Sequence, residues 1–332
     1  MPTLGIIGGG SWGTALAVAL ADRFDRIQLW VYEADLAREM EQSRINELYL
    51  PGFAIPANVF CTNELGEAAR GAEIVLGVVP SHLTRGVYEK LLPEVQEQTI
   101  FVSATKGLEN ESLLRTSQIM EEILSKRFRP RIAVLSGPTF AREVAALNPT
   151  VVVIASPDVL AAARVQVAFS SSFFRLYTST DVVGVEIGGA VKNVVAIGAG
   201  VVHGMGLAQN TLAALITRGL AEITRLAVAL GGSAATLAGL AGLGDLVLTC
   251  TGELSRNRTV GIELAKGRSL DEIVRSMKMV AEGVKTTSAT LELARRCGVE
   301  MPITEQMYQM LHNGLPPREA IRRLMERPLR EE

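Results

Sequence analysis

Short β-branched runs alternate with segments of helical length through the first half of the chain, and this alternation constrains the fold more than any other feature. The predicted strands cover residues 4–7, 26–32, 73–79, 99–104, 131–135, 151–155 and 173–177. Helices are expected between most of them, including 14–21, 113–124 and 159–169. Such alternation predicts parallel strands with helices on both faces of the sheet. We therefore expect a doubly wound α/β sheet.

The pattern changes after about Thr180. Stretches rich in Ala, Leu and Gly follow with helical spacing and almost no β-branched runs. Gly267, Gly298 and Gly314 each follow a predicted helix as a stop signal. A chain of 332 residues has room for about two domains. We expect a doubly wound domain over residues 1–180 and an all-α domain over residues 181–332.

One segment tests whether the chain enters a membrane. Residues 193–217 carry no Asp, Glu, Lys or Arg and are long enough to span a bilayer. Polar residues interrupt the segment, and residues 203–206 break it near its middle. We expect two buried helices joined by a turn rather than a membrane span, and the uncharged stretch 226–244 has the same interpretation.

Composition argues against several kinds of partner. The chain has 33 basic and 35 acidic residues, and aromatic residues make up only 5%, so it offers neither a broad positive field nor many stacking platforms for nucleic acid. Three scattered cysteines without a CxxC and three scattered histidines indicate no disulfide framework and no metal site. The chain enters an apolar strand by Leu4 without a signal-like segment, so we expect a cytoplasmic location.

A glycine-rich turn follows the first predicted strand and precedes a helix. It reads Gly8-Gly9-Gly10-Ser11-Trp12-Gly13 and has the GxGxxG spacing. Gly8 would form a tight turn, Gly10 would let a pyrophosphate approach, and Gly13 would let the helix pack on the strand. The spacing alone also fits an ordinary glycine turn. Its context, with Glu33 located 20 residues after Gly13, predicts a dinucleotide site of the Rossmann type.

The identity of the dinucleotide stays open at this point. Glu33 favours an unphosphorylated ribose, because a carboxylate repels a 2′-phosphate, but it could also be a solvated surface acid. Arg38 or Arg23 could instead accept the phosphate. Both NAD and NADP remain candidates.

Two further strand ends carry polar groups. The fourth predicted strand leads to Lys106, and the fifth leads to Gly137, Thr139 and Ala141 at a predicted helix start. Each segment could be an ordinary loop. Ligands of such sheets gather outside the carboxyl ends of the strands, so both segments are expected at one crevice.

The first long helix of the second half carries a stripe of small residues with one cation. Gly184, Gly188, Lys192, Ala196 and Gly200 recur every four residues. The stripe could serve plain helix packing, with Lys192 reaching solvent. On a water-poor face, however, the pKa of a lysine falls toward the range useful for proton transfer. No histidine has a comparable setting, so Lys192 is the best acid/base candidate.

Two segments beyond this helix complete the candidate site. Asp245 follows a glycine turn, and Ser255-Arg256-Asn257-Arg258 has the pattern of an N-cap with two guanidinium groups. A hydroxyl, backbone amides and arginines at a helix start suit a phosphate ester, although a solvated capped helix is the alternative.

With these motifs in order, the chain closely resembles the bacterial NAD(P)-dependent glycerol-3-phosphate dehydrogenases. The resemblance covers essentially the whole length and includes GGGSWGTALA, VVPSH, ATKGLE, SGPTFAREV, GGAVKNVVAIGAG, AGLGDLVLTCT, SRNR, VAEGVKT and VEMPIT. It implies a Rossmann domain followed by an all-α domain, and a homodimer. The implied reaction is the reversible NAD(P)H-dependent reduction of dihydroxyacetone phosphate to sn-glycerol 3-phosphate, which supplies phospholipid synthesis.

The resemblance also implies roles for single residues. Lys192 matches the catalytic proton donor and acceptor of the family. Substrate-contacting positions correspond to Lys106, Gly137, Thr139, Lys192, Asp245, Ser255, Arg256 and Asn257. Cofactor-contacting positions correspond to Ser11, Trp12, Lys106, Ala141, Arg256, Val280 and Glu282. Many relatives have a basic residue near Tyr32, whereas this chain has Val31-Tyr32-Glu33, a departure that counts against the usual NADP preference.

Two rival functions follow from the same motifs. The β-hydroxyacid dehydrogenases have a similar layout, but they pair their lysine with an asparagine one helical turn later. Here Ala196 occupies that place, and the asparagine is the adjacent Asn193. A nucleotide-sensing protein without turnover is the other rival, and it would need neither Lys192 nor the cluster around Ser255.

Overall fold

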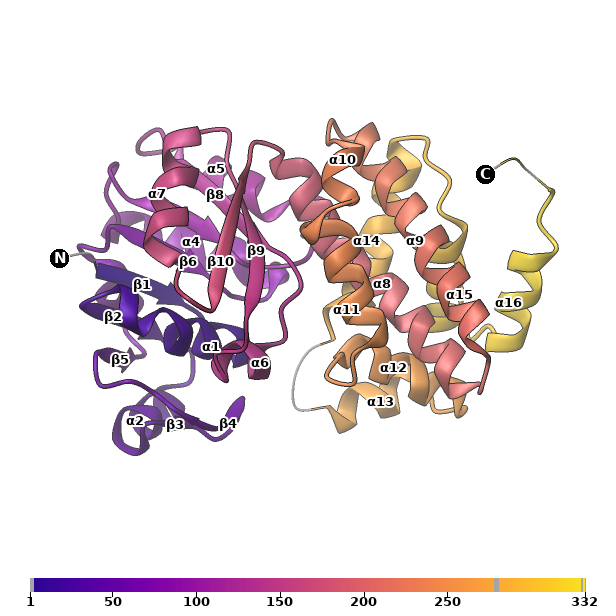
Figure 1. Ribbon diagram of the computed structural model, residues 1–332, viewed down its shortest axis with the longest axis horizontal. Helices are drawn as coiled ribbons and strands as arrows, with labels where there is room; N and C mark the ends of the chain where they lie inside the picture. Colours follow the sequence, from indigo (N-terminus) through magenta and orange to yellow (C-terminus); the bar gives the residue numbers. More distant parts are fainter. Residues whose placement is uncertain (1–2, 278–280, 330, 332) are drawn as a thin grey trace.

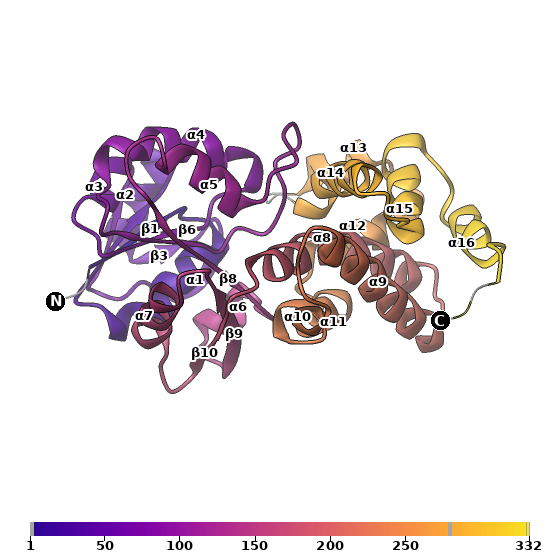
Figure 2. The same ribbon diagram turned by 90° about the horizontal axis from the view of Figure 1, so that it is seen from above.

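The computed structural model describes residues 3–277, 281–329 and 331, which form two lobes side by side (Figure 1). One lobe is built on a sheet and contains the N-terminus, and the other is helical and contains the C-terminus. Figure 2 shows helix α8 (Val182–Gly204) leading from the first lobe into the second.

The sheet has eight strands in the order β10-β9-β8-β7-β6-β1-β2-β5. Their bounds are β1 Thr3–Ile7, β2 Arg26–Trp30, β5 Val59–Thr62, β6 Ile74–Gly77, β7 Ile100–Ser103, β8 Arg131–Ser136, β9 Thr150–Ala155 and β10 Phe174–Ser179. Residue Gly5 of β1 pairs in parallel register with Gln28 of β2 on one side and with Val75 of β6 on the other. The strand order therefore reverses at β1, which is where ligands bind in open α/β sheets.

All seven predicted strands are present, but two of them, β9 and β10, run in the unexpected direction. Strand β9 is antiparallel to β8, whereas every other neighbouring pair in this sheet is parallel. The connection between them holds only the short helix α6 (Ala141–Ala145), which does not carry the chain back along the sheet as a crossover helix would. The structure also adds β5 and a hairpin of β3 (Ile45–Asn46) and β4 (Leu50–Ala54), which the sequence did not reveal.

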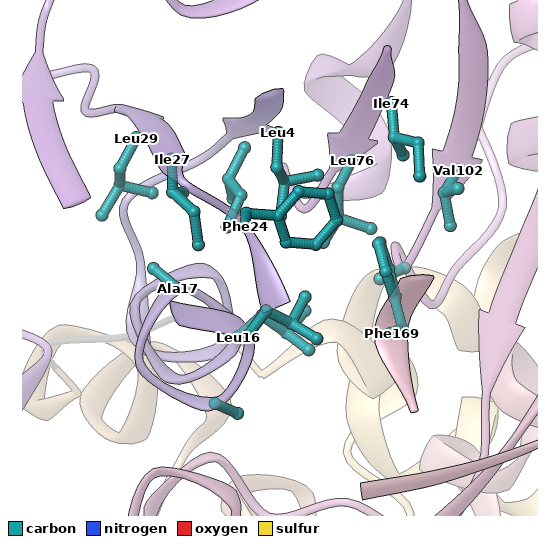
Figure 3. Packing of buried hydrophobic residues seen from close by; sticks show 14 of the residues in the cluster. Leu4, Leu16, Ala17, Phe24, Ile27, Leu29, Ile74, Leu76, Val102 and Phe169 are labelled. Atoms are coloured by element: carbon teal, nitrogen blue, oxygen red, sulfur yellow. The ribbon is translucent and has the colours of Figure 1, made fainter. Parts of the chain in front are cut away.

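Helices cover both faces of the sheet, as predicted. Helices α1 (Ser11–Leu20), α2 (Ala34–Ser43) and α7 (Val159–Phe169) lie on one face. Helices α3 (Leu65–Ala69), α4 (Thr84–Leu91) and α5 (Thr116–Leu124) lie on the other. On the first face, Leu4 of β1 and Leu76 of β6 pack with Leu16 of α1 and Phe169 of α7 (Figure 3). This burial on both faces accounts for the near-continuous apolar strands.

The second lobe has no strand among its described residues. Besides α8, its helices are α9 (Gln209–Ala229), α10 (Ala234–Leu237), a π-helical turn (Leu240–Gly244), α11 (Asp245–Thr251), α12 (Arg256–Ala265), α13 (Leu270–Ser276), α14 (Glu282–Arg296), α15 (Pro302–Asn313) and α16 (Pro317–Met325). Gly267, Gly298 and Gly314 follow α12, α14 and α15 with positive φ values of 87°, 66° and 65°, which confirms them as stop signals.

Helix α8 is the core of the helical lobe. It is long and apolar enough to cross a membrane, but 89% of its most apolar window is buried inside the protein. Its N-terminus is capped by Asp181, whose carboxylate accepts a hydrogen bond from the Gly184 amide. The predicted turn after α8 is present, but the prediction of a second buried helix is wrong for the first half of α9, where Ala213 and Ala214 are exposed.

The small residues of α8 allow close backbone approach. A Cβ at Gly188 would lie 2.6 Å from the carbonyl oxygen of Ala241, and one at Gly200 would lie 2.0 Å from that of Arg258. Any larger residue would push the π-helical turn and α12 away from α8. The close approach predicted from the stripe is therefore confirmed.

Candidate active site

Lys192 lies in the interior where the two lobes meet. Its exposed fraction is only 5%, so the alternative of a solvated lysine is wrong. Its Nζ donates hydrogen bonds to Oδ1 of Asp245 and, at 2.8 Å, to Oγ1 of Thr249. Burial lowers the pKa of Lys192 to about 7, with the charge of Lys106 acting in the same direction and that of Asp245 opposing it. Near neutral pH this amine can both give and accept a proton.

Lys106 reaches the same carboxylate from the end of β7. Its Nζ lies 2.7 Å from Oδ2 of Asp245, 3.0 Å from the Gly137 carbonyl oxygen and 3.4 Å from Oγ1 of Thr139. Asp245 is completely buried between the two amines. When both lysines are protonated, the three groups carry a net positive charge, which suits an oxygen that gains negative charge.

A glycine of α8 allows the strand end that carries Lys106 to lie close to α8. A Cβ at Gly189 would lie 2.7 Å from Oγ of Ser136 at the end of β8 and 3.6 Å from Cγ of Lys106. Gly137, which follows β8, has a φ of 150° that L side chains rarely adopt. The strand ends of the first lobe and α8 of the second are therefore in direct contact, and the two predicted loops do meet, since Lys106 bonds Gly137 and Thr139.

The cluster around Ser255 begins α12 and is joined to α8. The Ser255 hydroxyl caps the helix by accepting a hydrogen bond from the Arg258 amide at 3.3 Å. The Asn257 side chain donates to Oδ1 of Asn193 at 3.0 Å and accepts from the Gly283 amide at 2.9 Å. Ser255 and Asn257 are buried, so the predicted cap is present but is not a solvated one.

Arg256 extends from this cap toward solvent and toward α14. Arg256 is exposed, but desolvation by the surrounding protein lowers the pKa of its guanidinium group. The charge of Glu282 acts to raise that pKa. The guanidinium remains cationic and can pair with a phosphate.

The glycine turn has the geometry that a dinucleotide needs. Gly8 has a φ of 126°, and a Cβ at Gly13 would lie 1.8 Å from the Gly8 carbonyl oxygen, so both positions require glycine. Gly10 is the N-cap of α1, and apart from its chain neighbours and its own helix no described residue has an atom within 4 Å of its Cβ position. The first-turn amides of Ser11 and Trp12 have no partner within the helix, and the space beside Gly10 would let a pyrophosphate approach them. Trp12 shares an apolar cluster with Ala141 of α6.

Glu33 is the N-cap residue of α2 and is held by a neighbour. The hydroxyl of Tyr49 donates a hydrogen bond of 2.8 Å to Oε1 of Glu33, and burial, together with this bond, raises the pKa of Tyr49. Glu33 is exposed, as the surface-acid alternative expected, but one of its carboxylate oxygens is bonded to Tyr49. The proposal that Arg23 accepts a 2′-phosphate is wrong, because its guanidinium donates to the carbonyl oxygens of Val167 and Ala168.

Within the part of the chain that the structure describes, the remaining predicted site residues form no hydrogen bond with Lys106, Lys192 or Asp245. Tyr32 is 77% exposed and contacts Trp30 edge-on. Glu282 begins α14 and accepts a hydrogen bond from Oγ of Ser81 at 3.1 Å. Val280 lies outside the described residues. Among those residues, no group of three or more His, Cys, Asp or Glu side chains could hold a metal ion.

Sequence reasoning missed three residues of this network. Thr249 bonds Lys192, Asn193 bonds Asn257, and Ser81 bonds Glu282. Thr249 lies one helical turn after Asp245, and Asn193 follows Lys192 directly, so both spacings carried a signal. Ser81 lies 201 residues from its partner and carried none.

The fold and this site define a nicotinamide-dependent oxidoreductase. Two protein-family models match the chain: NAD-dependent glycerol-3-phosphate dehydrogenase N-terminus over residues 3–162 and C-terminus over residues 181–322. The chain belongs to this family.

Relatives agree over the full length. The chain is 54% identical to a glycerol-3-phosphate dehydrogenase [NAD(P)+] of Koribacter versatilis (strain Ellin345), covering 99% of this chain and 98% of the relative. It is also 54% identical, with the same coverage, to one of Geobacter sp. (strain M21). The crystal structure of glycerol-3-phosphate dehydrogenase from Coxiella burnetii is 39% identical, covers 98% of this chain and 99% of its own, and has a TM-score of 0.93.

Proposed function

We propose that this chain catalyses the reversible NAD(P)H-dependent reduction of dihydroxyacetone phosphate to sn-glycerol 3-phosphate. The observation that carries the proposal is the buried pairing of Lys192 of α8 with Asp245 of α11, a carboxylate that also holds Lys106 from the end of β7. A buried amine with a pKa of about 7 is suited to protonating a ketone oxygen.

We assign separate roles in the reaction to the residues of the site. Gly8, Gly10, Ser11, Trp12 and Gly13 would hold the dinucleotide, which supplies the hydride when bound. Lys192 gives its Nζ proton to the carbonyl oxygen and takes it back from the hydroxyl in the reverse direction. Lys106 adds positive charge beside that oxygen, and Asp245 holds both amines in place.

The phosphate of the substrate is assigned to the start of α12. Arg256 supplies a guanidinium group, and the first turn of α12 lies beside it. Asn257 is joined to Asn193, the residue after Lys192. The phosphate and the ketone would thus be held by neighbouring turns, with Gly137 and Thr139 on the opposite wall of the crevice.

Steady-state oxidation of NADH and of NADPH with dihydroxyacetone phosphate tests the proposal. We expect turnover with the phosphate ester and little with unphosphorylated dihydroxyacetone or with 3-oxo acids. Faster turnover of a 3-oxo acid would favour the β-hydroxyacid dehydrogenase alternative. Nucleotide binding with no turnover of any of these ketones would favour a sensor.

Membership of the family supports a proposal about the cellular setting. We place the enzyme in the cytoplasm, where its product supplies glycerophospholipid synthesis, and assign nucleotide binding to residues 1–180 and substrate binding to residues 181–332. Extracts of cells lacking the protein should lose the reduction of dihydroxyacetone phosphate, and the cells should need added glycerol phosphate for growth.

A homodimer is supported by the outer face of α9. Ala213 and Ala214 are exposed there in a stretch without charged residues, and Leu207 is 37% exposed just before the helix. Sedimentation should give a dimer for the wild type and a monomer for Ala214→Arg. A monomeric wild type would contradict this assignment.

A further inference from the structure

We propose that Tyr49 sets the coenzyme preference of this enzyme by holding the Glu33 carboxylate in place for the adenosine ribose, so that NADH binds better than NADPH. The inference rests on the proposed function, because it concerns the nucleotide that this reaction uses.

The geometry of Tyr49 suits a positioning role. Its ring packs against the apolar core of the sheet, while its hydroxyl donates to Oε1 of Glu33 at 2.8 Å. Among the described residues, Oε2 of Glu33 has no hydrogen-bond donor. One carboxylate oxygen is thus fixed by the protein, and the other can accept a hydrogen bond from a ribose hydroxyl.

The segment that carries Tyr49 is itself anchored to the glycine turn. Asn46 is completely buried, and its Nδ2 donates to the Gly9 carbonyl oxygen at 2.9 Å and to Oγ1 of Thr14 at 2.8 Å. Its Oδ1 accepts from the Tyr49 amide at 3.0 Å. Residues 46–49 therefore join the pyrophosphate end of the site to the ribose end and fix their separation.

The charges near Glu33 oppose a 2′-phosphate. Asp35 adds a second carboxylate in the first turn of α2, and Arg38 pairs with Asp35. Arg23 donates to carbonyl groups elsewhere. A phosphate on the ribose would meet a fixed carboxylate at close range, where like charges repel most strongly.

Calorimetric titration with NADH and with NADPH tests the proposal without relying on turnover. We expect the wild type to bind NADH at least about tenfold more tightly, which corresponds to about 1.4 kcal/mol. Tyr49→Phe keeps the packed ring and should weaken NADH binding several-fold, with NADPH unchanged or tighter. Glu33→Ala should improve NADPH binding. Tyr177→Phe removes a half-exposed hydroxyl from β10 at the opposite edge of the sheet and should change neither affinity.

The outcomes separate the two claims. Equal NADH and NADPH affinities in the wild type, or a Tyr49→Phe variant with the wild-type affinity ratio, would overturn the coenzyme proposal. A general loss of binding of both nucleotides with a lowered melting temperature would assign Tyr49 a merely structural role and also overturn it. Absence of dihydroxyacetone phosphate reduction with either nucleotide would overturn the proposed function, even where the NADH preference is found.

Discussion

Lys192 and Asp245 lie 53 residues apart in the chain and form an ion pair in the interior, where Asp245 is completely buried. The same carboxylate also holds Lys106 from the other lobe. The proton on Lys192 therefore depends on a balance between burial, one carboxylate and one neighbouring cation.

The two directions of the reaction should have opposite pH dependence. Reduction needs protonated Lys192, whose pKa is about 7, so kcat/KM for dihydroxyacetone phosphate should fall about tenfold per pH unit above that value. Oxidation of glycerol 3-phosphate needs the neutral amine, so its kcat/KM should rise through the same range. Initial rates measured from pH 5 to pH 10 in both directions test this prediction. If kcat/KM changed in the same sense with pH in both directions, the prediction would be contradicted.

Replacing Asp245 by Asn should move the reduction profile toward acid. The carboxylate raises the pKa of Lys192 against the effect of burial, so its neutral substitute leaves that pKa lower. At pH values above the pKa, each unit by which the pKa of Lys192 falls reduces the protonated fraction of Lys192 about tenfold. Thr251→Val on the same helix is the matched control, because Thr251 bonds only the Val247 carbonyl oxygen at an exposed position. If the pH at which reduction declines were the same in Asp245→Asn as in the wild type, Asp245 would not set the pKa of Lys192.

Glu186 joins the two lobes and should matter for stability. Its carboxylate accepts hydrogen bonds from the amide and hydroxyl of Ser117 at 2.8 and 2.6 Å, and it pairs with Arg115. Glu186→Ala leaves a mostly buried guanidinium without its partner, so we expect a loss of about 3–5 kcal/mol in urea unfolding.

The exposed pair of Glu73 and Arg164 provides the control for Glu186. Their side chains are 47% and 58% exposed, so Glu73→Ala should cost less than about 1 kcal/mol. Equal losses in the two variants would show that Glu186 does not act as a buried link between the lobes.

Glu222 should make stability depend on pH. It accepts hydrogen bonds from Ile303 and Thr304 at the start of α15, and burial raises its pKa from 4.5 to about 6. The folded state then binds more protons between these values, so the stabilisation is full below about pH 4.5 and is lost as pH rises past about 6. Relative to Glu222→Gln, the wild type should lose about 2 kcal/mol of unfolding free energy between pH 4.5 and pH 7. If the free energies of unfolding of the wild type and of Glu222→Gln changed equally with pH, this prediction would be contradicted.

The sequence predicts the main sheet well because its strands are β-branched runs that stand apart from their neighbours. It does not predict the β3–β4 hairpin, where Asn46 to Pro51 contains no β-branched residue and the structure depends on the buried amide of Asn46. Nor does it predict the direction of β9, because that depends on how far the short α6 carries the chain.

The candidate site divides in the same way. Lys106, Lys192 and Asp245 stand beside strand ends, a small-residue stripe and a glycine turn, which are local signals. The links of Tyr49 to Glu33 and of Ser81 to Glu282 join distant elements, and only the folded structure brings them together.

The most direct test of Lys192 as the proton donor is the turnover of Lys192→Ala with NADH and dihydroxyacetone phosphate, measured beside its affinity for NADH. Loss of a general acid costs roughly 100- to 10,000-fold in rate. We expect kcat to fall at least about 100-fold, with NADH affinity near that of the wild type. A variant that keeps wild-type turnover would contradict the assignment of Lys192 as the proton donor.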